Sequence, residues 1–234
     1  MGSFPPDGGN GIKLSPWVIA RLGRGLQWGT LFAVVCATLV SFADTRTVYT
    51  IDLARSEFAV QLFKAGVGSA LAHDHVVRAT MFTGQVQIDL ATPTNGSITV
   101  EVQTASLKID EPAMRQKYGL PSQLSEKDRQ QIQETMKSLS QLDVEHYPVM
   151  TFTSTKIEAQ ATGGYTVTGK LTIRGVTQSV IFPTYVERQG NALHVRGSFR
   201  FKQSGFGYEP YSALFGAVRN QDEVLLHFDV LAPP

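Results

Sequence analysis

Apolar residues recur at every second position along most of this chain after Val48. The clearest run lies between Phe82 and Leu90, where five apolar or glycine positions alternate with threonine, glutamine and aspartate. Successive side chains of a β-strand point to opposite faces, so each such run predicts a strand with one apolar face. The same period recurs in the ranges 49–53, 58–62, 98–102, 165–173, 193–201 and 224–230.

Short turn signals separate these predicted strands. They include Asn95-Gly96, Gly163-Gly164, Arg174-Gly175 and Gln189-Gly190. Strands joined by such turns pair in antiparallel fashion with their neighbours in the sequence. Because every strand has one apolar face, closing the sheet on itself buries that face and removes exposed edges. The sequence therefore predicts a mainly β fold, a closed antiparallel β-barrel of about eight strands.

One segment, from Ser125 to Leu142, departs from the period of two. Ile132, Met136 and Leu139 follow each other at helical spacing, with glutamine, glutamate and lysine on the other face. Ser125 is a suitable N-cap for an amphipathic α-helix. We expect this one helix either to cover an opening of the barrel or to pack on its outer wall.

The first 43 residues differ in composition from the rest. Arg21 and Arg24 precede an apolar run from Leu31 to Val40, and small residues follow up to Ala43. This pattern is typical of a secretory signal peptide, because the run is short for a membrane span of about 20 residues. We predict a signal peptide in 1–43, a single domain in 44–234 and a periplasmic location; an uncleaved anchor in the inner membrane is the alternative.

Charge and cysteine content exclude several classes of function. After residue 43 the chain has 18 basic and 19 acidic residues, so it lacks the basic excess of a nucleic-acid-binding protein. Cys36, the single cysteine, lies in the predicted signal peptide. The remaining chain can form neither a disulfide nor a thiolate nucleophile.

Four phrases of the sequence are distinctive in combination. Residues 169–177 read Gly-Lys-Leu-Thr-Ile-Arg-Gly-Val-Thr, and 147–154 read Tyr-Pro-Val-Met-Thr-Phe-Thr-Ser. The other two are the segment 72–84, with its histidines followed by Phe-Thr-Gly, and the closing segment 206–224. Together these phrases resemble the YceI family of secreted, lipocalin-like β-barrels. A long polar insertion over 111–142 departs from the family pattern.

This resemblance implies a binding protein and not an enzyme. The ligand it implies is an isoprenoid or similar long apolar lipid held in the barrel, for instance a quinone or a polyprenyl carrier. No cofactor is expected, and no catalytic motif is present in the sequence. We expect the lipid as partner, with transient membrane contact; the oligomeric state is not predicted.

Eight residues are candidates for contact with such a lipid. His75 and Arg78 would meet a polar head group, and the inward apolar side chains would line the tunnel: Phe58, Phe82, Met136, Phe152, Phe199 and Phe201. Glycines at 84, 169 and 197 would leave room inside. The same apolar residues could instead fill a packed core, because an eight-stranded barrel is only just wide enough to hold a slender ligand.

Two other functions remain open at this stage. His73 and His75 share a strand face and could bind a metal in an envelope enzyme, with His146 as third ligand. Alternatively, a barrel with a filled interior could be a scaffold for another envelope protein. Asp52, Asp89 and Asp110 lie at predicted strand ends, and we predict no special role for them.

Overall fold

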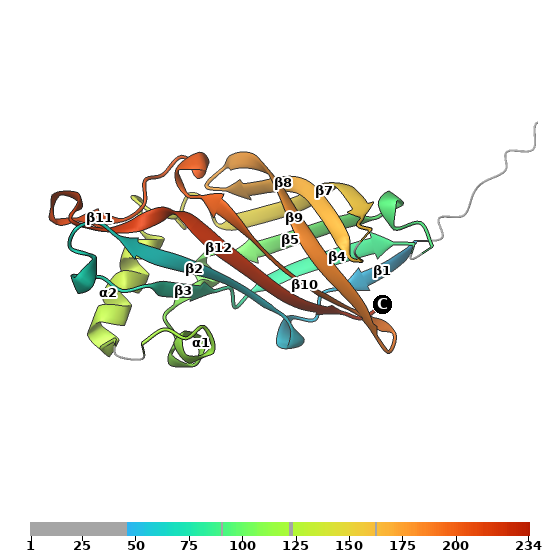
Figure 1. Ribbon diagram of the computed structural model, residues 1–234, viewed down its shortest axis with the longest axis horizontal. Coiled ribbons are helices and arrows are strands. Elements are labelled where there is room, and N and C mark those ends of the chain that lie inside the picture. Colours follow the sequence, from blue (N-terminus) through green and yellow to red (C-terminus); the bar gives the residue numbers. More distant parts are fainter. Residues whose placement is uncertain (1–45, 90, 122–123, 162) are drawn as a thin grey trace, which may run out of the picture. The chain divides into compact units, whose positions relative to one another are not determined.

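The computed structural model describes residues 46–234 except 90, 122–123 and 162, and these residues form a curled antiparallel sheet with two α-helices (Figure 1). The strands are β1 (Thr47–Thr50), β2 (Glu57–Ala65), β3 (His75–Arg78), β4 (Phe82–Ile88), β5 (Ser97–Gln103), β6 (Lys108–Ile109), β7 (Val149–Ala159), β8 (Tyr165–Ile173), β9 (Val176–Gln189), β10 (Ala192–Lys202), β11 (Ser212–Ala213) and β12 (Val218–Ala232). The helices are α1 (Pro112–Lys117) and α2 (Glu126–Lys137).

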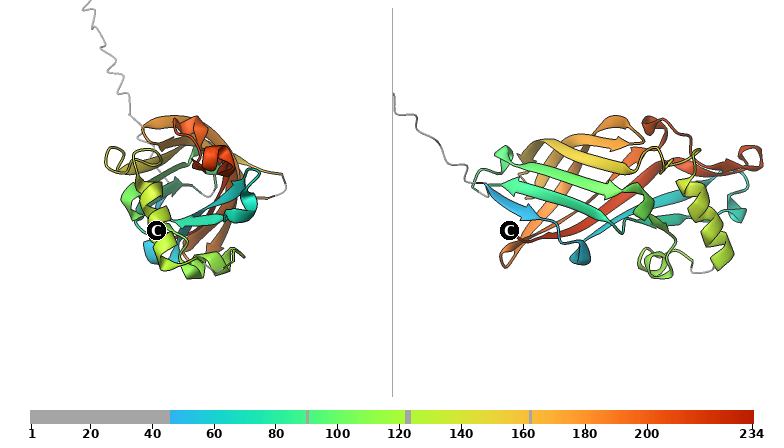
Figure 2. Two further views of the ribbon diagram at one scale, coloured as in Figure 1. Left: turned by 90° about the vertical axis from the view of Figure 1, so that its left-hand side faces the viewer. Right: turned by 180° about the vertical axis from the view of Figure 1, so that it is seen from behind.

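The sheet closes into a ring because three of its strands are interrupted by bends. β1 leads into β2, β3 into β4 and β5 into β6. β12 pairs with β2, which pairs with β3, while β1 pairs with β4, which pairs with β5. The end of β1 also lies against the end of β12, since the Thr50 N–H donates at 2.8 Å to the carbonyl of Pro233, the residue that follows β12. With the bent strands counted once and the short β11 left out, the pairings give a ring of eight strands, so the predicted barrel is confirmed. Figure 2 shows the curled sheet from its end and from behind.

The ring is less regular between β9 and β10. Their pairing runs from Ala192 opposite Gln189 only as far as Gly197 opposite Thr184. The next residue of β9 is Pro183, whose carbonyl oxygen faces Gly197. Proline has no N–H to donate to a neighbouring strand, so the ladder ends there. Beyond this point the 3₁₀ helix Ser204–Phe206 (η5) is held to β9 by a hydrogen bond from the Gln178 side chain to the Gly205 carbonyl at 2.6 Å.

Glycines on the inner face let aromatic rings lie flat against the sheet. A Cβ atom at Gly169 would lie 2.4 Å from the ring of Phe152, and one at Gly197 would lie 2.4 Å from the ring of Phe228. The space that these glycines leave is therefore occupied by phenylalanine rings. At Gly84 the Ile51 side chain takes the same place. Each of the three glycines therefore leaves room for a side chain of the barrel itself, which lies closer to the sheet than a bulkier residue would allow.

The predicted helix is present but shorter than expected. α2 begins after Ser125, whose hydroxyl accepts a hydrogen bond from the Asp128 N–H at 3.1 Å. It ends at Lys137, because Ser138 is extended, and Leu139 is consequently 69% exposed. The second helix, α1, was not predicted; with six residues it is too short to show an apolar period, although Pro112 is a favoured first residue of a helix.

The predicted signal peptide in 1–43 lies outside the described residues. Within the part of the chain that the structure describes, no helix has the length and apolar character to cross a bilayer.

We predict that Gly197→Ala destabilises the barrel. The added methyl group would lie 2.6 Å from the Pro183 carbonyl and 2.4 Å from the Phe228 ring, so strand or ring must shift. Overpacking of this kind costs about 1–3 kcal/mol of unfolding free energy, which urea denaturation would measure. Gly205→Ala is the matched control, since its nearest neighbour would be 3.9 Å away. Equal stability of the two variants would contradict the prediction.

Candidate functional site

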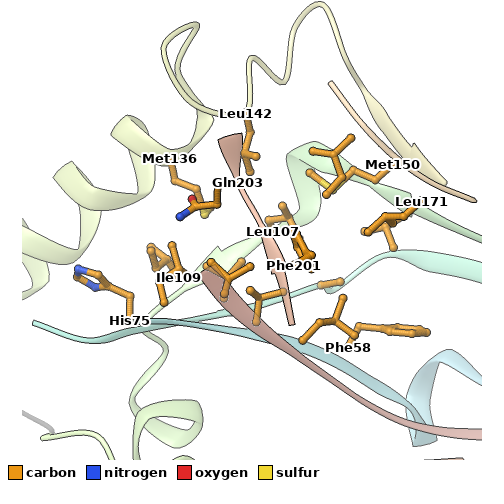
Figure 3. Close-up of a pocket in the computed structure, with 18 of the residues that line it drawn as sticks. Phe58, His75, Leu107, Ile109, Met136, Leu142, Met150, Leu171, Phe201 and Gln203 are labelled. Atoms are coloured by element: carbon orange, nitrogen blue, oxygen red, sulfur yellow. The ribbon is translucent and has the colours of Figure 1, made fainter. Parts of the chain in front are cut away.

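The interior of the barrel contains a cavity of about 490 Å³ (Figure 3). This volume falls in the range of about 300–1,000 Å³ that is usual for ligand sites. Its wall is built from the inward positions of the strands, including Val60, Val100, Leu171 and Phe228. The alternation of each strand explains this wall, because every second side chain points inward. The interior is therefore not a fully packed core.

Aromatic rings make up one side of this cavity. Phe182 and Phe199 stack with ring centroids 4.6 Å apart, and Phe152 lies 5.5 Å from Phe182. Phe201 continues the series, 6.0 Å from Phe199. These rings come from β7, β9 and β10, which lie within the run of adjacent strands β7-β8-β9-β10. The result is a continuous apolar surface suited to the flank of a slender hydrocarbon chain.

The two ends of the barrel differ. Near β1 and the C-terminus the interior is filled by a small cluster of buried side chains, Tyr49, Val86, Ile88, Leu193 and Ala232. At the other end the cavity is bordered by α2, by His73 before β3, and by Tyr211 and Asn220 on either side of the β11–β12 loop. We call this end the mouth; α2, the β2–β3 loop and the β11–β12 loop are seen there in Figures 1 and 2.

Helix α2 lies at the mouth and contributes side chains to the cavity. Ile132 and Met136 line it and pack on the core. Gln133 fixes the helix to the sheet: its side-chain amide donates to the Leu107 carbonyl at 2.8 Å, and its oxygen accepts from the Ile109 N–H at 2.9 Å. Of the two positions considered for this helix, the structure supports the cover over an opening.

A buried carboxylate ties the strands near the mouth together. Asp110, 1% exposed, accepts hydrogen bonds from Arg115 at 2.7 Å and from the Val76 N–H at 3.1 Å. Its second oxygen lies 2.6 Å from Nδ1 of His75. Arg115, 2% exposed, also donates to the carbonyls of Asp74 and Pro121. The prediction that Asp110 has no special role is therefore wrong, because this residue joins β3, β6 and α1.

The environment of Asp110 decides its protonation. Burial raises its pKa, but the hydrogen bond and charge of His75 and the bonds from Arg115 and the Val76 N–H outweigh burial and leave the pKa below its ordinary value. The carboxylate is therefore charged at neutral pH and holds Nδ1 of His75. The other ring nitrogen, Nε2, is left for contacts at the cavity, which His75 lines.

Six of the eight predicted contact residues line the cavity: Phe58, His75, Met136, Phe152, Phe199 and Phe201. Two do not. Arg78 points away and forms an ion pair with Glu111 at 2.7 Å, and this pair raises the pKa of Arg78 and lowers that of Glu111. Phe82 is 4% exposed and packs edge-on behind Phe58, with ring centroids 4.9 Å apart. Neither side chain is placed to touch a ligand in the cavity.

The histidines do not converge on one point. His73 and His75 both line the cavity, but His146 pairs with Asp143 at 2.8 Å. That pairing raises the pKa of His146. Among the described residues no three histidine, cysteine, aspartate or glutamate side chains come close enough to hold a metal.

Polar lining residues were also missed by sequence reasoning. Gln203 is 4% exposed and donates to the Gln221 carbonyl at 2.9 Å. Thr184 lines the cavity at 3% exposure, and within the described structure its hydroxyl has no hydrogen-bond partner. Its hydroxyl oxygen is itself buried, so it is an unsatisfied polar atom within an apolar wall. Thr184 could have been predicted from the sequence, because the alternation of β9 places it on the same inner face as Phe182.

Comparison with known proteins places this architecture in a family. The sequence model of the YceI-like domain matches residues 49–232. The chain is 27% identical over 162 residues to a UPF0312 protein of Shewanella baltica strain OS155, covering 68% of this chain and 73% of that protein. A UPF0312 protein of strain OS185 matches equally.

Solved structures share the fold. The crystal structure of BcnA from Burkholderia cenocepacia superposes with a TM-score of 0.60 at 26% identity, over 78% of this chain and 99% of that one. The YceI protein of Campylobacter jejuni gives a TM-score of 0.51 at 17% identity, over 68% and 84% of the two chains, which shows the fold alone. The lipocalin-like barrel and the resemblance to the YceI family are therefore confirmed.

We predict that Asp110→Asn destabilises the protein at neutral pH by about 3–5 kcal/mol, because Arg115 would be left as an unpaired buried charge. The lowered pKa of Asp110 fixes the pH dependence. A carboxylate of this kind stabilises the fold above its unfolded-state pKa of about 3.9, and the contribution is lost as pH falls through the folded-state pKa. Urea unfolding between pH 3 and 7 should show a smaller acid-induced loss in the variant.

Asp52→Asn is the control for this experiment. Hydrogen bonding to Arg55 also lowers the pKa of Asp52, but this carboxylate lies at the surface. We expect the control to unfold almost as the unchanged protein does at neutral pH. An equal effect of the two substitutions would contradict the role given to Asp110.

Proposed function

The chain belongs to the YceI-like family, and we propose that it binds an isoprenoid or a similar long apolar lipid inside the barrel without catalysing a reaction. The observation that carries the proposal is the cavity of about 490 Å³ between the filled end and the mouth, walled by aliphatic and aromatic side chains. Family and fold by themselves suggest a β-barrel binding protein. The apolar wall supports the choice of a lipid.

The energetics favour a ligand of this kind. Each CH₂ group that leaves water contributes about 0.8 kcal/mol, so ten such groups would contribute about 8 kcal/mol before the cost of ordering the chain. A net 8 kcal/mol would correspond to a Kd of about 1 μM, and the cost of ordering the chain weakens binding from that value, so more than ten buried groups are needed for micromolar affinity. A forty-carbon chain buried over its whole length would exceed the ceiling of about 20 kcal/mol for non-covalent affinity. We therefore expect part of a long isoprenoid to stay outside the mouth.

His75 is our choice for the contact with a polar head group, as in a quinone or a polyprenyl carrier. Asp110 fixes Nδ1 of its ring at 2.6 Å, so Nε2 has a defined position near the mouth. A neutral imidazole would accept a hydrogen bond there, and an imidazolium would donate one to a phosphate or carbonyl oxygen. Arg78 forms an ion pair with Glu111, so we do not propose it as a contact for the head group.

The two other functions have less support. A metal enzyme centred on His73 and His75 needs a third ligand, and His146 is engaged with Asp143. A scaffold without ligand would be expected to have a filled interior, which the cavity contradicts. For the location, we propose secretion to the periplasm, supported by the signal-like segment 1–43.

We predict that Val100→Trp abolishes lipid retention. Val100 lines the cavity from β5, so an indole there would occupy space that the lipid needs. The measurement is the native mass of the protein purified from its own envelope, before and after organic extraction. We expect a mass excess that extraction removes in the unchanged protein and its loss in the variant.

Glu101→Trp is the matched control, because the next residue of β5 is exposed on the outer face. This variant should keep its lipid. A bare polypeptide mass for the unchanged protein, or lipid retained equally by both variants, would count against the proposal.

A further inference from the structure

Four strongly exposed apolar side chains gather on two loops beside the mouth. They are Val67 at 98% and Leu71 at 77% exposure on the β2–β3 loop, and Leu214 at 66% and Phe215 at 112% on the β11–β12 loop. We call them the apolar tips. Both loops lie at the end of the barrel that carries α2 (Figure 1). His73, which follows the first loop, and Tyr211 and Asn220, on either side of the second, line the cavity.

The two loops are fixed to each other. The Gly68 N–H donates to the Ala217 carbonyl at 2.8 Å. Gly66 has a φ of 91°, and a Cβ atom there would lie 2.3 Å from the same carbonyl oxygen. Only a glycine permits this approach of the loops. The apolar tips are therefore held together as one structure at the edge of the mouth.

The backbone under Phe215 is strained. Leu214 and Phe215 have φ values of 50° and 54°, in the left-handed region that bulky residues rarely adopt. Each such residue costs about 1 kcal/mol or more. This conformation places the phenylalanine ring wholly in solvent, where it gains nothing from packing within the chain. Strain of this kind is expected where the exposed group has a function outside the fold.

From these observations we propose that the apolar tips insert into the surface of a phospholipid membrane and so place the mouth against the bilayer. The inference rests on the proposed function, since a lipid ligand has its source or destination in a membrane. Separate projecting side chains suit a bilayer, which moulds itself around each of them, better than a protein partner, which needs a complementary pocket for each.

Basic side chains near the tips fit an anionic membrane. Lys64 precedes the first loop and Arg219 follows the second, and both are exposed. Within the described part of the chain Arg219 has no ion pair, and Lys64 reaches only the Ala72 carbonyl at 3.4 Å. Acidic residues lie in the same region: Asp74 accepts a hydrogen bond from the Lys64 N–H at 2.7 Å, and Glu209 is exposed before β11. Anionic head groups would thus find positive charge beside the inserted side chains.

The test is sedimentation of the purified protein with vesicles of phosphatidylcholine and phosphatidylglycerol, comparing the unchanged protein with Phe215→Asn. Asparagine tolerates the left-handed conformation, so the loop should keep its shape and the fold its stability. A phenylalanine ring that leaves water contributes enough for about a tenfold or larger change in partition. We expect the variant to bind at least about tenfold more weakly, and more phosphatidylglycerol to strengthen binding of the unchanged protein.

Ile181→Thr is the matched control, because this isoleucine is 66% exposed on the outer wall in β9. Unchanged vesicle binding by this control supports the role of the tips. Equal binding by Phe215→Asn and the unchanged protein overturns the proposal. So does a protein partner that, without vesicles, binds the unchanged chain and not the variant.

Lipid extraction from the same samples separates the two proposals. A protein that retains lipid but does not bind vesicles would contradict membrane insertion and leave lipid binding intact. Vesicle binding that depends on Phe215, in a protein that retains no lipid, would support insertion and contradict the proposed ligand.

Discussion

The structure depends on one constraint: every strand of a closed ring presents its apolar side chains inward, and eight strands enclose more space than those side chains fill. Near β1 the interior is filled by Leu193, Tyr49 and their neighbours. Toward the mouth, glycines such as Gly197 draw rings against the sheet, so the wall is lined and the centre stays empty. The cavity is thus a consequence of closure and of where glycine and phenylalanine fall along the strands.

The open end needs interactions of another kind, because apolar packing is incomplete there. Asp110, Arg115 and His75 supply them, and each charge is satisfied by hydrogen bonds within the cluster. A buried ion pair gives little net stability compared with apolar packing, but the loss of one partner is costly. Such a cluster therefore fixes one arrangement of β3, β6 and α1. The same bonds set the position of the His75 imidazole, which lines the cavity near the mouth.

The sequence was sufficient for the barrel because a period of two leaves little choice of fold. It also placed the inward phenylalanines, since facing follows directly from position in a strand. The sequence did not predict the direction of a side chain at a bend between strands. Arg78 lies at the end of β3, and its side chain binds Glu111, which is 33 residues away in the chain. Asp110 was missed for the same reason. Its burial is created by contacts with Arg115 and Val76, which no local pattern reveals.

Strong exposure of apolar side chains and a strained backbone also depend on the folded structure. Nothing in the sequence around Leu214 and Phe215 distinguishes them from residues of a core strand. In the fold they lie in a left-handed turn beside the mouth, next to a second exposed loop. A cavity for a lipid needs a route by which the lipid leaves the bilayer without crossing water. In the proposed mode of binding, apolar side chains at the mouth and an apolar interior behind it would together provide that route, because the hydrocarbon would pass from one apolar environment to another.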